Sequence, residues 1–203
     1  KRQLSASLAT SALVSTVMMA TLVVGPFYLS RTLGLDAALV GLVLSIGPLV
    51  AALSAVPAGR LADWLGTQRV TTVGLVGMGA GAFTLSMLPS SLGIPGYIAP
   101  IVIMTASYAL FQTANNTAVM SDVSPEQRGA VSGILNLSRN LGLITGASVM
   151  GAVFAFGSAA SDIATAPPES VATGMRIAFA VAGSLVVIAL VIATEARLPL
   201  RNR

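Results

Sequence analysis

Charged side chains are rare in this sequence and divide it into long uncharged runs. Arg2 and Arg31 bracket 28 uncharged residues, and Asp36 and Arg60 bracket 23. A helix that crosses the hydrocarbon core of a bilayer needs about 20 mostly apolar residues. The pattern therefore predicts membrane-spanning helices at approximately 4–30, 37–59, 70–88, 97–121, 129–157 and 177–194.

The longest run lies between Arg69 and Asp122 and holds 52 uncharged residues, too many for one span. Its segment 89–96 contains two prolines and two glycines, residues that mark a turn. The run therefore predicts two helices, and residues 1–203 as a whole predict a single domain of six spans.

Two other interpretations of the apolar runs fail. Strands of an outer-membrane barrel alternate apolar and polar residues over about ten positions, and the run 181–193 shows no such alternation. A signal peptide has an apolar core of about 7–15 residues, far shorter than the first uncharged run. We expect an all-α integral membrane protein.

Composition narrows the function. The 203 residues are 55% hydrophobic and 9% charged, with a mean hydropathy of +0.87, against about 25% charged in a typical soluble domain. That balance excludes most soluble enzymes, and the scattered basic residues form no patch for nucleic acid. His and Cys are both absent, which excludes zinc sites, disulfides and imidazole catalysis. We expect no metal, no cofactor and no enzymatic activity.

The distribution of Lys and Arg predicts the orientation. Cytoplasmic loops of membrane proteins are enriched in these residues. With six spans, both termini and the loops at 60–69 and 122–129 share one side, which carries eight basic residues against two, Arg31 and Arg176, on the other. We expect a multi-pass protein of the plasma or inner membrane with both termini cytoplasmic. The eight residues are Lys1, Arg2, Arg60, Arg69, Arg128, Arg197, Arg201 and Arg203.

Arg139 is the residue of the predicted spans whose transfer into the bilayer would cost the most free energy. If the fifth helix begins near Gly129, Arg139 lies about 15 Å deep, where a charge needs a cavity or a partner. Asn136 and Ser132 share its face of the helix. Two interpretations stay open: Arg139 lines a substrate or proton-coupling cavity, or it ties the helix to its neighbours and reaches toward the cytoplasm.

Gln112 and Asn116 lie four residues apart in the fourth predicted helix and therefore share a face. They could bind a ligand in a cavity or form hydrogen bonds between helices. Small residues allow close helix contact in membranes. The pairs Gly129/Gly133 and Gly142/Gly146 therefore predict helix-packing seams.

The segment 59–69 is the first informative cluster. Gly59 allows close helix approach, Gly66 supplies a tight turn, and Asp63 can bind a helix N-terminus or pair with Arg60 or Arg69. From the residues alone, a basic loop that only sets topology is an equal alternative.

The pattern Gly59-x-x-x-Asp63-x-x-Gly66-x-x-Arg69 resembles the signature loop of the major facilitator superfamily, between the second and third helices of a six-helix half. The stretch 124–146 and the segment 25–29 resemble drug:proton antiporters of the multidrug efflux type. The resemblance covers nearly the whole chain.

This resemblance implies the C-terminal half of a secondary transporter that exports small organic molecules by alternating access. In the family, the signature loop latches the two halves together. Trp64 and Gln68 depart from the strongest form of the motif. The implied partners are the lipid bilayer, the N-terminal half and an organic substrate, with protons if transport is proton-coupled. No carboxylate lies deep in any span, so a titrating carboxylate would have to lie in the N-terminal half.

The chain starts at Lys1 rather than Met, so we expect a processed or truncated piece. The alternative function is a non-transporting truncated membrane subunit or scaffold.

Overall fold

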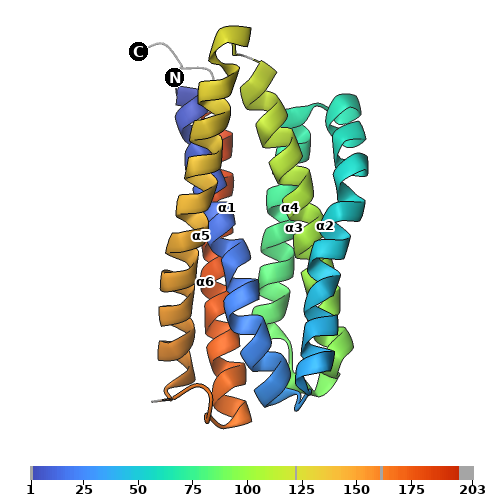
Figure 1. The fold of residues 1–203 in the computed structure, drawn as a ribbon, viewed down its shortest axis with the longest axis vertical. Helices are drawn as coiled ribbons and strands as arrows, with labels where there is room; N and C mark the ends of the chain where they lie inside the picture. The colour runs from blue at the N-terminus through green and yellow to red at the C-terminus, as the bar shows by residue number, and fades with distance from the viewer. Residues whose placement is uncertain (1, 122, 161, 197–203) are drawn as a thin grey trace.

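The computed structural model describes residues 2–121, 123–160 and 162–196 and is all-helical there (Figure 1). This confirms the predicted fold class. Each long helix is apolar and long enough to cross a membrane. The long helices are α1 (Arg2–Phe27), α2 (Ala37–Leu65), α3 (Thr67–Met87), α4 (Gly93–Ser121), α5 (Arg128–Ser158) and α6 (Pro168–Glu195), with a π-helical turn at Tyr28–Thr32 and 3₁₀ turns at Ser90–Leu92 and Pro125–Gln127.

Capping and turn residues account for several helix ends. The Asp36 side chain accepts a hydrogen bond from the Leu39 amide at 2.9 Å and caps the start of α2. Gly66 alone separates α2 from α3, with φ at 84°, a backbone conformation that favours glycine. Pro168 opens α6, since proline fits the first turn of a helix, where its missing amide hydrogen costs nothing.

Two helices extend beyond the ranges that hydropathy indicates. α6 begins at Pro168, nine residues before position 177, and includes Glu169 and Arg176. α2 continues to Leu65, so Arg60 and Asp63 lie in its last turns and not in a loop. Charged residues at helix ends can reach the polar interface, so a helix extends further than its uncharged stretch.

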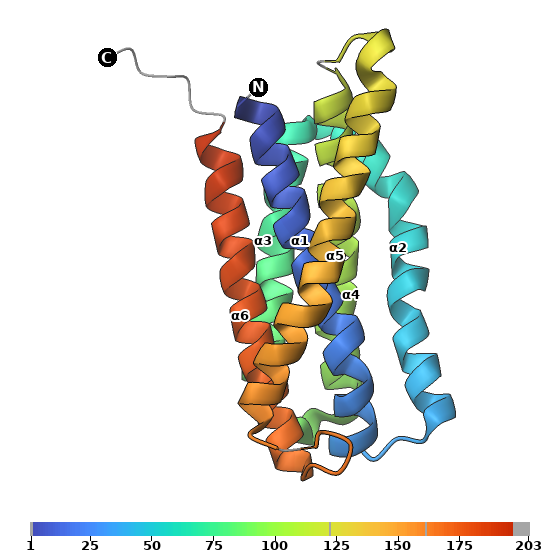
Figure 2. The ribbon, with the colours of Figure 1, turned by 60° about the vertical axis from the view of Figure 1, so that its left-hand side comes forward.

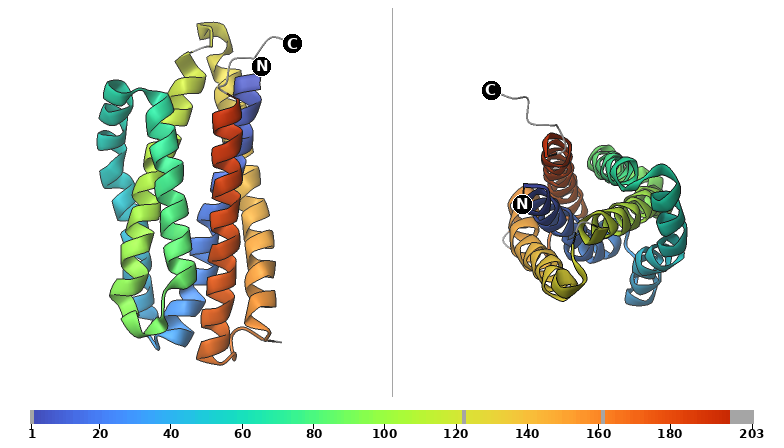
Figure 3. Two further views of the ribbon diagram at one scale, coloured as in Figure 1. Left: turned by 180° about the vertical axis from the view of Figure 1, so that it is seen from behind. Right: turned by 90° about the horizontal axis from the view of Figure 1, so that it is seen from above.

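The helices alternate in direction, and the two ends of the described chain lie at the same end of the bundle. A guanidinium nitrogen of Arg2 donates to the carbonyl oxygen of Glu195 at 3.2 Å. Viewed from above, α1, α5 and α6 lie on one side and α2, α3 and α4 on the other (Figure 3). α2 stands at one edge of the bundle and α6 at the opposite edge (Figure 2).

Interhelical contacts are closest where small residues meet. The Thr16 hydroxyl of α1 donates to the carbonyl oxygen of Gly142 at 3.0 Å, and the Ser138 hydroxyl of α5 donates to that of Leu8 at 2.7 Å. A Cβ added to Gly146 would lie 2.7 Å from the Thr16 carbonyl oxygen. Glycine therefore allows α1 and α5 to touch backbone to backbone.

The other predicted seam behaves differently. A Cβ added to Gly129 or Gly133 would meet nothing within 4 Å, apart from its own helix backbone and its chain neighbours. Neither glycine packs on another helix of the described chain. The same four-residue spacing thus marks a tight contact at Gly142 and Gly146 and an open surface at Gly129 and Gly133, earlier in α5.

Candidate functional site

The four polar residues singled out in the sequence line one cavity. Gln112 and Asn116 approach it from α4, and Asn136 and Arg139 from α5. The cavity has a volume of about 220 Å³, and Ser11 of α1 also contributes to its wall. Each pair is spaced so that both residues share a face of their helix. α5 packs on α1 and α4 on α3 and α2, and this arrangement of the bundle turns the two faces toward a common space.

Arg139 is half-buried and oriented by its own helix. One of its terminal nitrogens donates to the Asn136 side-chain oxygen at 3.1 Å, and the Asn136 amide donates to the Ser132 carbonyl oxygen at 3.1 Å. α5 begins at Arg128 and spans 31 residues, so Arg139 lies about 16 Å from its start, one turn before its midpoint. Arg139 therefore lies closer to the centre of the helix than to its first end.

A second cavity, which the sequence did not indicate, has a volume of about 230 Å³ and mostly apolar walls. This cavity is lined mainly by α1, α2 and α4. Tyr108 lies one helical turn before Gln112 on α4, and Leu143 lies one turn after Arg139 on α5, so the two cavities occupy successive levels of the bundle. The position of Tyr108, four residues before Gln112 in the sequence, was an available signal. The lining residues are Met18, Thr21, Leu22, Val43, Leu44, Gly47, Pro48, Ala51, Tyr97, Ile101, Thr105, Tyr108 and Leu143.

Tyr108 connects the two levels. Its side chain lies close to that of Ser15 on α1 and within electrostatic reach of Arg139. The ring itself lines the apolar cavity. An apolar wall and a basic, amide-lined wall therefore meet at this residue.

Asn115, next to Asn116 in the sequence, has a packing position. It is buried, and its amide nitrogen lies 3.5 Å from the carbonyl oxygen of Ser7 on α1. Gln112 is half-buried and Asn116 is exposed on the cavity side of α4. The amide groups of α4 thus divide between a helix contact and a cavity wall.

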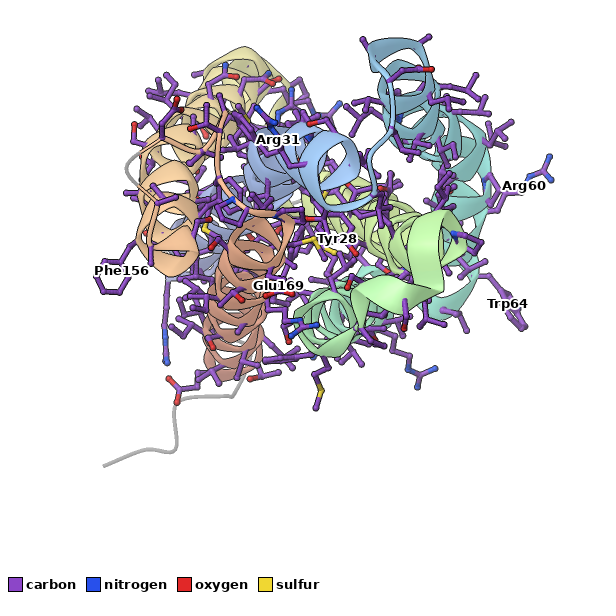
Figure 4. All side chains as sticks on the ribbon, turned by 90° about the horizontal axis from the view of Figure 1, so that it is seen from below. Tyr28, Arg31, Arg60, Trp64, Phe156 and Glu169 are labelled. Carbon is purple, nitrogen blue, oxygen red and sulfur yellow. The ribbon has the colours of Figure 1, made fainter. Side chains whose placement is uncertain are left out.

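The motif residues Gly59, Arg60, Asp63, Gly66 and Arg69 lie where α2 meets α3. Arg60, Asp63, Gly66 and Arg69 are exposed, and Gly59 is half-buried. Arg60 and Trp64 extend away from the bundle (Figure 4). Asp63 forms no ion pair with either arginine within the part of the chain that the structure describes.

The sequence is similar to a known protein family and to individual transporters. Residues 1–147 match the Major Facilitator Superfamily. The chain is 34% identical over 146 residues to the uncharacterized transporter YebQ of Escherichia coli, and 28% identical over 130 residues to the riboflavin transporter RibZ of Clostridioides difficile. It is also 24% identical over 127 residues to the multidrug efflux pump LfrA of Mycolicibacterium smegmatis.

These matches cover 72%, 64% and 63% of this chain but only 32%, 28% and 25% of the respective relatives. The chain therefore corresponds to about a third or less of the length of each relative that it matches.

Solved transporter structures share the fold. The peptide transporter POT superposes with a TM-score of 0.78 at 19% identity, covering 96% of this chain and 37% of POT. The nucleoside transporter NupG superposes with a TM-score of 0.77 at 15% identity, covering 98% of this chain and 49% of NupG. With six apolar helices and the family match, the chain is a multi-pass membrane protein; it belongs to the Major Facilitator Superfamily.

Proposed function

We propose that this chain is the C-terminal half of a secondary transporter that exports small organic, drug-like molecules by alternating access. The observation that carries the proposal is a pair of neighbouring cavities, a polar one between α1, α4 and α5 and an apolar one lined mainly by α1, α2 and α4. Gln112, Asn116, Asn136 and Arg139 line the polar level, and Tyr108 and Leu143 line the apolar level. Transporters of this kind bind substrate between two helical repeats that rock about the site.

Two relatives support parts of this proposal. One is described as a multidrug efflux pump, which supports export, and another as a riboflavin transporter, which supports a small organic substrate. Because the chain matches only about a third of each relative, an N-terminal half would supply the facing wall of the site. We expect Gly129 and Gly133, which are open in this chain, to contact that half.

Proton coupling would also depend on the N-terminal half. The carboxylates in the described part of this chain lie at helix ends or in connections, namely Asp36, Asp63, Glu126, Asp162, Glu169 and Glu195. A drug:proton antiporter would therefore carry its titrating carboxylate outside these spans. We expect Asp63, Arg60 and Arg69 to hold the two halves together on the cytoplasmic side, as in the family's signature loop.

Export is tested by dye accumulation in cells that express the full-length gene. Arg139→Ala should lower efflux because it removes the charge of the cavity wall, and Asp63→Asn should lower it because it weakens the latch. Arg31→Ala, at the opposite end of the bundle, is the matched control. Unchanged efflux in the Arg139 variant at equal membrane expression would remove the site assignment. The absence of energy-dependent efflux in wild type would favour a non-transporting subunit or scaffold.

The orientation is tested by labelling single cysteines, since this chain has none of its own. Ser124 is exposed between α4 and α5, and Ser91 is exposed between α3 and α4 at the other end. In a cysteine-free full-length protein, an impermeant maleimide should label Ser91→Cys in intact cells and should label Ser124→Cys only after lysis. The reverse pattern would contradict cytoplasmic termini and a plasma-membrane orientation with the positive side inside.

A further inference from the structure

We infer that the transporter selects amphipathic substrates that carry an anionic group, with Arg139 as the specificity-determining residue of this half of the site. The inference rests on the proposed function and names its substrate class. The inference concerns the charge of the substrate. An exporter could transport neutral or cationic molecules as well, so the proposed function does not by itself require an anionic group.

The side chains that line the polar cavity carry positive charge and no negative charge. Of the eight residues that line it, Arg139 is the only one with a charge. No carboxylate within the described ranges forms an ion pair with it. Glu126, in the 3₁₀ turn before α5, is the described carboxylate nearest to Arg139 in sequence, 13 positions away, which corresponds to about 20 Å of helical rise. A cation placed in this cavity would meet repulsion that no acidic group on this side offsets.

The guanidinium retains donors for a ligand. A guanidinium carries five N–H donors, and the bond to Asn136 uses one of them. That bond, with the bond from Asn136 to the Ser132 carbonyl, holds the side chain before any ligand arrives. Arginine binds carboxylate and phosphate oxygens with two parallel hydrogen bonds, and the amides of Gln112 and Asn116 can bind the remaining polar atoms.

The apolar cavity, one helical turn from the polar cavity, can bind the apolar part of the substrate. Tyr108 and Leu143 line the apolar cavity at a rise of about 6 Å from Gln112 and Arg139 along their helices. A molecule with a flat apolar body can therefore lie against Tyr108 while its acidic group reaches Arg139. The arrangement fits a hydrophobic acid and disfavours a hydrophobic cation.

Two dyes with the same three-ring skeleton and opposite charge test the inference. Fluorescein is anionic and rhodamine 123 is cationic, and fluorescence anisotropy reports the binding of each to purified full-length protein. We expect wild type to bind fluorescein about tenfold more tightly than rhodamine 123. Arg139→Gln should abolish that preference, Arg139→Lys should retain part of it because the charge remains, and the control Arg31→Gln should leave it intact.

Several outcomes would overturn the inference: equal affinity for both dyes, preference for rhodamine 123, an equal loss of both in Arg139→Gln, or binding of neither dye. The size-exclusion profile of each variant shows whether it is folded. The two proposals fail separately. Export of rhodamine 123 from cells without an anion preference leaves the exporter intact and removes the inference. If fluorescein binding depends on Arg139 but no dye is exported in an energy-dependent way, the inference about the substrate stands and the proposal of an exporter fails.

Discussion

α1 and α2 are both apolar enough to span a membrane, yet their surroundings differ sharply. In the most apolar stretch of the first span, 56% of the residues are buried by this chain, whereas the figure for α2 is 6%. α2 nevertheless has the higher hydropathy, 2.3 against 1.8. Hydropathy therefore shows that a helix can cross the bilayer, but it does not show which helix the others surround.

The side chains that α1 buries explain the difference. Its buried positions include hydroxyl residues such as Ser11, Ser15 and Thr16 beside alanine and valine. α2 buries only Val43, Ala58 and Ala62. Lipid is as apolar as leucine, so helix association in membranes depends on close packing of small residues and on interhelical hydrogen bonds. A helix rich in small polar residues is therefore central, and one rich in large apolar residues faces outward.

The largest effect should come from filling the contact between α1 and α5. A Cβ added at Gly142 would clash with the Ala12 carbonyl, whereas one added at Gly41 of α2 would meet nothing within 4 Å beyond its own backbone and chain neighbours. We expect Gly142→Val to cost about 3 kcal/mol, measured by thermal unfolding of the full-length protein in detergent. Gly41→Val introduces the same helix-propensity change without the clash. Equal losses in both would contradict the comparison.

A smaller effect should separate two valines. Val17 of α1 is fully buried, and Val56 of α2 is 63% exposed. Val17→Ala should cost about 1 kcal/mol because it leaves a void among packed neighbours, and Val56→Ala should fall within about 0.5 kcal/mol of wild type. Thermal unfolding of the full-length protein in detergent measures the stability loss of each variant. A cost at Val56 equal to that at Val17 would mean that a helix outside this chain covers the outer face of α2.

The smallest effect should come from one hydrogen bond. The Ser138 hydroxyl of α5 donates to the Leu8 carbonyl oxygen of α1 at 2.7 Å, a bond between two helices. The Ser45 hydroxyl donates to the Leu42 carbonyl oxygen at 2.7 Å, a bond within α2. Ser138→Ala should cost about 0.6 kcal/mol, the average for an interhelical bond in a membrane protein, and Ser45→Ala should cost less. A larger loss in the Ser45 variant would show that interhelical bonds are not what distinguishes the two helices.

The sequence by itself determined the all-helical fold class and a membrane location. It also indicated that Gln112 shares a face with Asn116, and Arg139 with Asn136. These properties are local: in lipid each helix must satisfy its own backbone hydrogen bonds, so length, hydropathy and the 3.6-residue period suffice. The hydropathy of a segment does not determine where its helix ends in the polar interface, because charged residues can continue the helix there. For this reason α6 begins nine residues before its uncharged stretch.

Only the tertiary structure decided which faces meet. It brought Gln112 and Arg139 to one cavity and placed an apolar cavity beside them at Tyr108. It also buried Gly142 and Gly146 against α1 while leaving Gly129 and Gly133 open, although both pairs have the same spacing. The physical reason is that neighbouring helices and lipid tails are equally apolar, so hydropathy carries no information about lateral neighbours. That choice depends on shape complementarity between whole helix surfaces.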